Sequence, residues 1–423
     1  MAGRQTTNHG LDSLPSPVMP TRGHGTHTVA GIDRFDPASF HRSTKDVKRF
    51  TLHKSAQPAS TGLTEDKHGI GGEPTARPWV HHETFGFVCR PSKMNGDATP
   101  PVAGPRGMST PRKTFIQVTE IWVPSRDRGR LELAAGLYGG LGDFREASTQ
   151  KRFQFGEGLP GKAWSVGHPV VVRHFDDFNF RRTQAAHDAG LTCGIAIPVF
   201  AGDFLLAVTV FLCGDSGDSA GAIEVWRAAA EDGARLHLMN GYFGRLREFE
   251  KAARETAFEP GVGLPGRVWS EGMPVVMEHV DTDAGFIRAD PARAAGIRSG
   301  IGIPLLRDDD QTYVMTLLSA GSIPVARRYE VWVPDEDADG LVFRTGFCDD
   351  ASDLAFEYEG QVIGKGHGII GRVALTGVPA LTDYLEADTS VAARLAFADG
   401  FENIVALPVI QDARLKCVVA WYF

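Results

Sequence analysis

The chain has 423 residues, of which 42% are apolar and 23% are charged, and its formal net charge is −8. This length suggests two to four domains, and the composition is typical of folded proteins with hydrophobic cores. The charge is uneven, because residues 1–114 hold 15 Lys and Arg against 9 Asp and Glu, whereas residues 115–423 hold 29 against 43. The acidic part is therefore a poor candidate for nucleic-acid binding, which needs a basic face.

Residues 1–114 contain 12 of the 25 prolines and 8 of the 14 histidines, with little hydrophobic periodicity. This pattern predicts a largely disordered segment. It has no apolar signal-peptide core and fits a transit peptide only weakly, so we expect a cytoplasmic protein, with organelle import left open. The odd number of cysteines and the lack of a CxxC pair predict reduced thiols; they are Cys89, Cys193, Cys213, Cys348 and Cys417.

From residue 115 the chain repeats itself three times. Gly156, Gly261 and Gly366 open related segments and are each 105 residues apart. A period of this length corresponds to a small domain rather than to a solenoid repeat. A Glu-x-Trp segment also recurs, as Glu120-Ile-Trp122, Glu224-Val-Trp226 and Glu330-Val-Trp332. We expect domains at 115–217, 218–323 and 324–423, the third divergent and without a C-terminal helix.

Each repeat predicts the same elements in chain order. A hairpin of alternating apolar and polar residues opens the unit, and a charged helix follows, as at 247–253. The glycine segment, a short strand at 169–173 and a helix at 182–189 come next, and Gly190 ends that helix. A second hairpin, 194–200 with 205–212, closes the unit. Hairpins at both ends predict an α+β domain with a mainly antiparallel sheet flanked by helices.

Two segments imitate other structures. Residues 195–213 are apolar except for Asp203 and have the length of a membrane span, but the matching stretches carry Arg307-Asp-Asp-Asp and Gln411-Asp-Ala-Arg. We therefore expect a hairpin and no transmembrane helix. Gly156-x-Gly158-x-x-Gly161 fits a dinucleotide-binding pattern, but no apolar strand precedes it and barely more than one helical turn fits after it. These glycines are expected to shape a turn.

Taken together, the repeated motifs resemble the GAF domain family over residues 115–423. The motifs are Gly156–Trp164, Gly167–Val171 and Ala189–Val199, with Gly261–Trp269, Gly272–Val276 and Ala295–Leu305 in the second repeat. The third repeat has Ile370 and Ala374 where the others have Pro and Trp.

The resemblance implies a small molecule bound between the sheet and the segment that joins the middle strands, here 172–193, 277–299 and 382–403. Arg, Asp and His side chains around an apolar pocket could hold a small anion or a nucleotide-like ligand. Alternatively, Arg and Asp pair to hold the loop while Phe fills the core. The candidate ligand-binding residues are His174, Asp176, Phe180, Arg182, His279, Asp281, Phe286, Arg288 and Tyr384.

Three functions agree with this pattern. We expect a non-catalytic, ligand-sensing or regulatory signalling protein, with no catalytic or metal-binding residues and an unknown cofactor. Its expected partners are an unidentified small molecule and a protein or a second copy, but neither nucleic acid nor membrane. One alternative is a thiol redox enzyme similar to GAF-type methionine sulfoxide reductases, which proximity of Cys193 to Cys213 would favour and opposite-facing side chains would disfavour. The other is a dimerisation scaffold whose pockets are filled by side chains.

Overall fold

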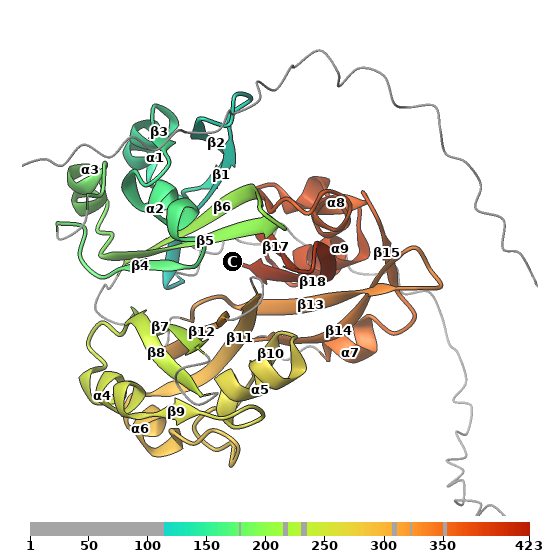
Figure 1. Cartoon of the computed structure of the whole chain (residues 1–423). Coiled ribbons are helices and arrows are strands. Elements are labelled where there is room, and N and C mark those ends of the chain that lie inside the picture. Colours follow the sequence, from blue (N-terminus) through green and yellow to red (C-terminus); the bar gives the residue numbers. More distant parts are fainter. Residues whose placement is uncertain are drawn as a thin grey trace, which may run out of the picture. The chain divides into compact units, whose positions relative to one another are not determined.

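The computed structural model describes residues 114–423, apart from 177–178, 215–218, 230–234, 307–310, 322–323 and 350–352. The predicted disorder of the N-terminal segment lies outside the described residues. The described part forms three six-stranded antiparallel sheets, with helices packed on each (Figure 1). All three share one strand order, so the predicted α+β fold, repeated three times, is confirmed. The orders are β3-β2-β1-β6-β5-β4, β9-β8-β7-β12-β11-β10 and β15-β14-β13-β18-β17-β16.

The described elements follow the predicted order in each repeat. Those of domain 1 are β1 (Ile116–Pro124), β2 (Arg130–Leu137), α1 (Gly142–Thr149), β3 (Arg152–Gln154), α2 (Gly158–Val166), β4 (Val170–Val172), α3 (Thr183–Asp188), β5 (Cys193–Ala201) and β6 (Phe204–Cys213). Those of domain 2 are β7 (Ser219–Ala229), β8 (Leu236–Tyr242), α4 (Arg247–Glu255), β9 (Ala257–Phe258), α5 (Gly263–Glu271), β10 (Val275–Met277), α6 (Ala289–Ala294), β11 (Ile297–Leu306) and β12 (Gln311–Gly321). Those of domain 3 are β13 (Arg328–Asp335), β14 (Gly340–Cys348), α7 (Leu354–Glu357), β15 (Val362–Gly364), α8 (Gly368–Thr376), β16 (Ala380–Thr382), the 3-10 helix η3 (Leu385–Ala387), α9 (Val391–Ala398), β17 (Ile404–Gln411) and β18 (Arg414–Tyr422).

The glycine segment forms a tight turn that leads into a helix. Gly158 has a φ of +58°, and Gly167 ends α2 in the left-handed conformation, which glycine adopts without strain. The helix has nine residues and is longer than predicted, because it begins before Pro160. Proline is tolerated there, since the first turn of a helix does not use its N–H groups. The glycines of this segment therefore shape a turn of the backbone, as expected.

Gly161 is the position in this turn with the least space. A Cβ at Gly161 would lie 2.1 Å from the carbonyl oxygen of Gln154. We expect Gly161→Ala to destabilise domain 1 by about 1 to 3 kcal/mol, because the strand and the helix must move apart. Native-state hydrogen exchange of the α2 and β3 amides measures this loss. Gly140→Ala is the control, because its Cβ would meet no atom within 4 Å, and an equal loss there would contradict the steric explanation.

The central strands of each sheet are covered on both faces. One face packs on the helices of its own domain, where Val210 lies in the core of domain 1. The other face enters a core that all three domains share, to which Phe211, Ile303 and Trp421 belong. Strands covered on both sides have nearly continuous apolar sequences, which explains the apolar run at 195–213. That run is the hairpin of β5 and β6, and none of the described helices has the length and hydropathy of a membrane span.

The three domains contact one another in a closed cycle. The fourth strand of each domain, which is short, contacts the second strand of another domain. Thus β4 contacts β8, β10 contacts β14, and β16 contacts β2. Asn240 in β8 donates a hydrogen bond to the carbonyl oxygen of Val171 in β4 at 3.3 Å. The backbone N–H of Phe115 likewise reaches Pro324 O at 2.9 Å, which joins domain 1 to the start of domain 3. Head-to-tail contacts that return to the first member form a ring.

Candidate functional site

In the opening strand of each domain, the glutamate of the Glu-x-Trp segment points into the interior of that domain. Side chains two residues apart point to the same face of a strand, so Glu120 and Trp122 lie together, and both are fully buried. The indole Nε1 of Trp122 donates a hydrogen bond to Glu120 at 2.9 Å. The same bond is 3.1 Å between Trp226 and Glu224. Each interior therefore contains a carboxylate.

In domain 1 the carboxylate pairs with Arg182, which occupies the residue position directly before α3. Arg182 donates to both oxygens of Glu120, with Nη2 at 2.9 Å from Oε2, and also to the hydroxyl of Ser148. Tyr138 donates to Oε1 at 3.0 Å. Burial alone raises the pKa of Glu120, but the Arg182 guanidinium and the hydrogen bonds to the carboxylate hold that pKa below its usual value. The pair is thus ionised inside the domain.

Aromatic rings surround the guanidinium in domains 1 and 2. Its carbon lies within cation–π range of four ring centroids in each domain. In domain 1 these are Phe144 at 4.8 Å, Phe180 at 5.2 Å, Trp122 at 5.7 Å and Phe153 at 6.0 Å from Arg182. In domain 2 they are Phe249 at 4.6 Å, Trp226 at 5.2 Å, Phe286 at 5.3 Å and Phe258 at 5.5 Å from Arg288.

Domain 2 repeats the ion pair with one different support. Arg288 occupies the position directly before α6 and reaches the two oxygens of Glu224 at 2.5 and 2.9 Å. The hydroxyl of Thr316 donates to the same carboxylate at 2.7 Å. The guanidinium, the carboxylate and the rings thus occupy the space between the sheet and the segment that joins the middle strands.

Domain 3 keeps the ion pair but takes its arginine from another element. Arg328 lies on β13, two residues before Glu330, and its Nε is 2.7 Å from that carboxylate. Ser390 holds the helix-capping position that Arg182 holds in domain 1. Glu330 also accepts hydrogen bonds from three further donors, which are Tyr358 at 2.6 Å, Tyr422 at 2.7 Å and Trp332 at 2.9 Å. Burial, together with the charge of Glu330, raises the pKa of Tyr358 and of Tyr422 far above the usual value of a tyrosine.

Comparison with known proteins gives a likeness of fold. No family model and no curated protein matches the chain. Among solved structures, it is similar to the GAF domains of phosphoenolpyruvate-protein phosphotransferases from Acinetobacter (16% identity, 24% of this chain, 57% of that one, TM-score 0.19) and Coxiella burnetii (18%, 23%, 56%, 0.20). It is also similar to free methionine-R-sulfoxide reductase from Neisseria meningitidis, solved with its substrate (19%, 24%, 56%, 0.19). The three domains have a GAF-like fold. The matches span little more than half of these structures.

The nine candidate residues separate into two groups in the GAF-like domains. Phe180, Arg182, Phe286 and Arg288 lie together in the two interiors. The other five lie outside: His174, His279 and Tyr384 are exposed, Asp281 is half-buried, and exposed Asp176 contacts His187 at 3.3 Å.

The expected pairing of Arg182 with Asp176 is wrong, because Arg182 pairs with Glu120. Phe180 fills the core, as that alternative expected. The Nε atoms of Arg182 and Arg288 have no hydrogen-bond partner among the described residues. In each arginine the Nε–H is thus the group on which binding of a ligand depends, and the expectation that these arginines bind a ligand stays a prediction.

Three interior residues were missed as site residues, namely Glu120, Glu224 and Glu330. The sequence carried a signal for them, since each stands in a strand, is followed directly by an apolar residue and lies two positions before Trp. A carboxylate that shares a strand face with a buried Trp must be buried as well, and a buried carboxylate requires a cation. The recurrence of Glu-x-Trp was therefore evidence for three internal ion pairs.

The cysteines of the GAF-like domains are buried. Cys193 and Cys213 are direct partners across β5 and β6 and belong to the shared core. The structure thus brings them together, as the redox alternative requires. Burial raises the pKa of the Cys417 thiol to about 12, so that it is not a thiolate at neutral pH.

Because all four described cysteines are buried, we expect them to resist alkylation. In a full-length Cys89→Ser variant, iodoacetamide at pH 7.5 should modify these thiols at least about a hundredfold more slowly than in urea-unfolded protein, because the thiolate is the reacting form and must be accessible. Mass spectrometry of timed samples measures the rates. Rapid modification of Cys193 or Cys213 in the folded protein would instead indicate an accessible redox pair.

Proposed function

We propose that this protein is a non-catalytic regulatory scaffold, in which three GAF-like domains form one unit and act through a partner. The observation that carries the proposal is the buried Arg–Glu pair of each domain. It fills the region in which the GAF resemblance implied a bound molecule, and in domains 1 and 2 four aromatic rings cover the guanidinium. The interiors are thus occupied by the chain's own side chains.

The two ways of building the pair support the same conclusion. Domains 1 and 2 use the arginine directly before a helix, and they have Val118 and Ala222 at the strand position that corresponds to Arg328. Domain 3 uses the strand arginine and has Ser390 at the cap. Each interior contains a buried glutamate paired with a buried arginine, although the arginine comes from different elements. A need for charge balance inside the domain explains this pattern, because an unpaired buried carboxylate is costly.

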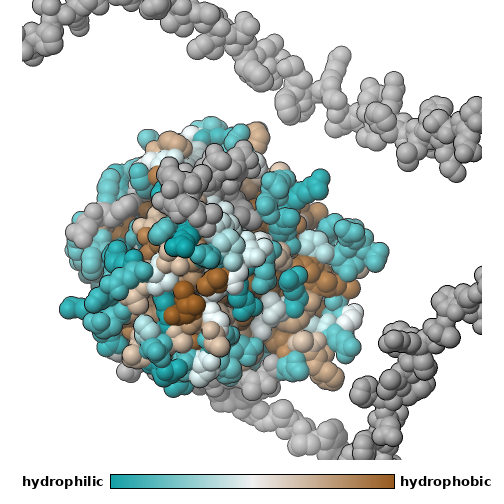
Figure 2. All heavy atoms as spheres, turned by 60° about the horizontal axis from the view of Figure 1, so that its bottom comes forward, coloured by the Kyte–Doolittle hydropathy of each residue, from teal (hydrophilic) through white to brown (hydrophobic). Residues whose placement is uncertain are grey.

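The contacts between sheets also favour a scaffold. The sheet faces that point away from the helices are used within the chain, in the shared core. Large exposed hydrophobic side chains are scattered over the surface, as Figure 2 shows for one face, and single exposed residues of this kind are ordinary.

Native mass spectrometry of the full-length protein from its own host tests the proposal. We expect no small molecule that depends on the domain interiors. The control is Glu120→Leu with Arg182→Met, which replaces the ion pair by apolar side chains of similar size. A bound mass that is lost on denaturation and is absent from this variant would contradict the scaffold function and support a ligand sensor.

A thiol redox enzyme is the second candidate, because Cys193 and Cys213 face each other across two strands. Both side chains are fully buried, so a substrate could reach them only if the shared core opened. The alkylation experiment described above separates this function from the scaffold.

A further inference from the structure

A cavity of about 60 Å³ lies where the three sheets meet. Three equivalent prolines line it, namely Pro198, Pro304 and Pro408. They stand on β5, β11 and β17, just beyond the last residues paired with the short strands β4, β10 and β16. Proline fits there, since it has no N–H to offer a neighbouring strand. The cavity is separate from the Arg–Glu pairs, which lie on the opposite faces of the sheets.

Trp421 brings an unsatisfied hydrogen-bond donor to this cavity. Its side chain is fully buried and lines the space, and its Nε1 has no partner among the described residues. In contrast, Trp122, Trp226 and Trp332 each donate to a glutamate. A buried indole N–H normally has an acceptor, because leaving it without one costs stability.

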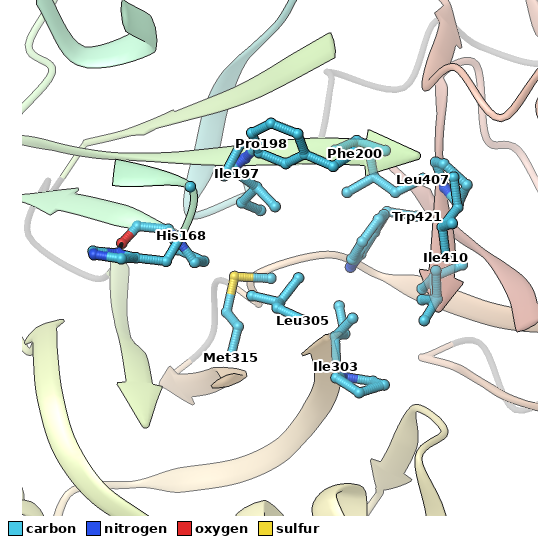
Figure 3. Close-up of a pocket in the computed structure, with 17 residues that line it drawn as sticks. His168, Ile197, Pro198, Phe200, Ile303, Leu305, Met315, Leu407, Ile410 and Trp421 are labelled. Carbon is cyan, nitrogen blue, oxygen red and sulfur yellow. Dashed lines mark hydrogen bonds between the residues drawn. The ribbon is translucent and has the colours of Figure 1, made fainter. Parts of the chain in front are cut away.

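The remaining walls are mostly apolar. Figure 3 shows Met315, Leu305 and Ile303 along one side, Ile197 and Phe200 along another, and His168 across the space from Trp421. His168 is held in place, since its Nδ1 donates to Pro169 O at 3.0 Å and its ring stacks on Tyr313 at 5.1 Å. A mostly apolar space in which the Trp421 indole is a donor without a partner suits a molecule that is apolar except for an acceptor.

We propose that this cavity binds a small, largely apolar molecule with a single acceptor oxygen, such as a short-chain ketone, through the indole N–H of Trp421. A cavity volume of roughly 10 to 15 Å³ holds one water molecule, so this cavity has room for several water molecules. It is far below the roughly 300 Å³ at which pockets for drug-sized ligands begin. Because its walls come from all three domains, a bound molecule stabilises the closed ring. This site goes beyond the scaffold function, which concerns the domain interiors.

Nuclear magnetic resonance of full-length protein labelled with ¹⁵N-tryptophan tests the site. Trp421→Phe assigns the Trp421 indole resonance by its disappearance. We expect 2-butanone to shift this resonance downfield and saturably, because the ketone oxygen accepts the N–H. Its hydrocarbon isostere 2-methyl-1-butene should bind about tenfold more weakly and cause no such shift, since it has no acceptor. Leu407→Phe, which fills part of the cavity, should abolish the shift while the resonances of Trp122, Trp226 and Trp332 stay in place.

Two results would overturn the inference. If 2-butanone leaves the Trp421 resonance unchanged while that resonance shows contact with water, the cavity is a water site, and the scaffold function stands. If the ketone shifts the resonances of Trp122 or Trp226 instead, the domain interiors bind ligands, and both the inference and the scaffold function fail.

Discussion

Replacing Arg182 by Met is expected to lower the free energy of unfolding of domain 1 by about 3 to 5 kcal/mol, since it leaves the carboxylate of Glu120 buried without a cation. Methionine keeps much of the volume among the rings, so the loss reports mainly the charge. Hydrogen exchange of the β1 and β6 amides, followed by mass spectrometry, measures the change within this domain.

Two variants make the Arg182 experiment decisive. Arg181→Met removes the neighbouring arginine, which is exposed and pairs with Glu157 at 3.0 Å, and we expect a change below about 1 kcal/mol. Adding Glu120→Gln to Arg182→Met should recover part of the stability, because it removes the unpaired charge and keeps an acceptor oxygen for the donors of Trp122 and Tyr138. If the double variant is as unstable as Arg182→Met, packing around the guanidinium rather than charge balance decides the stability.

The second large effect is expected in domain 3. Arg328→Met should destabilise this domain by about 3 to 5 kcal/mol, because Glu330 would keep only neutral donors. Asp399 also loses its contact with Arg328 at 2.6 Å, and Glu357 loses one at 3.9 Å, so three carboxylates lose this cation. Exchange of the β13 and β18 amides measures the loss.

The control for domain 3 is Arg372→Met, which removes an exposed arginine from α8 and should change stability by less than about 0.5 kcal/mol. Glu330→Gln in the Arg328→Met background removes the unpaired charge and should recover part of the loss. A further loss in that double variant would mean that the carboxylate serves mainly as an acceptor for Tyr358, Tyr422 and Trp332.

The fold could be predicted because its signals are local. Gly167 must adopt a left-handed backbone and Gly161 must let a strand approach, and such needs fix the residue type wherever the unit recurs. The closed cycle of domains was not predicted, because an apolar strand face does not say which other face covers it.

The candidate site was predicted in part for a related reason. Matching positions pointed to Arg182 and Arg288, but the partner Glu120 lies 62 residues from Arg182 along the chain, and sequence spacing cannot pair them. His174 and Asp176 share the same segment, yet they face solvent, since the direction of a loop side chain depends on a backbone path that no periodicity reveals. In domain 3 the arginine stands on another element, so alignment of the repeats could not find it.

The shared core has a consequence for the protein during its synthesis. Domain 1 is complete in sequence at β6, but Trp421, which packs against Phe211 with ring centroids 5.8 Å apart, is translated about two hundred residues later. At roughly 5 to 20 residues per second, that delay is about 10 to 40 seconds. During that time, domain 3 does not yet cover the apolar face of the first sheet that enters the shared core. The nascent chain is therefore expected to need protection by a chaperone. A chain released from a ribosome that stalls before β18 would expose this apolar face and be prone to aggregate.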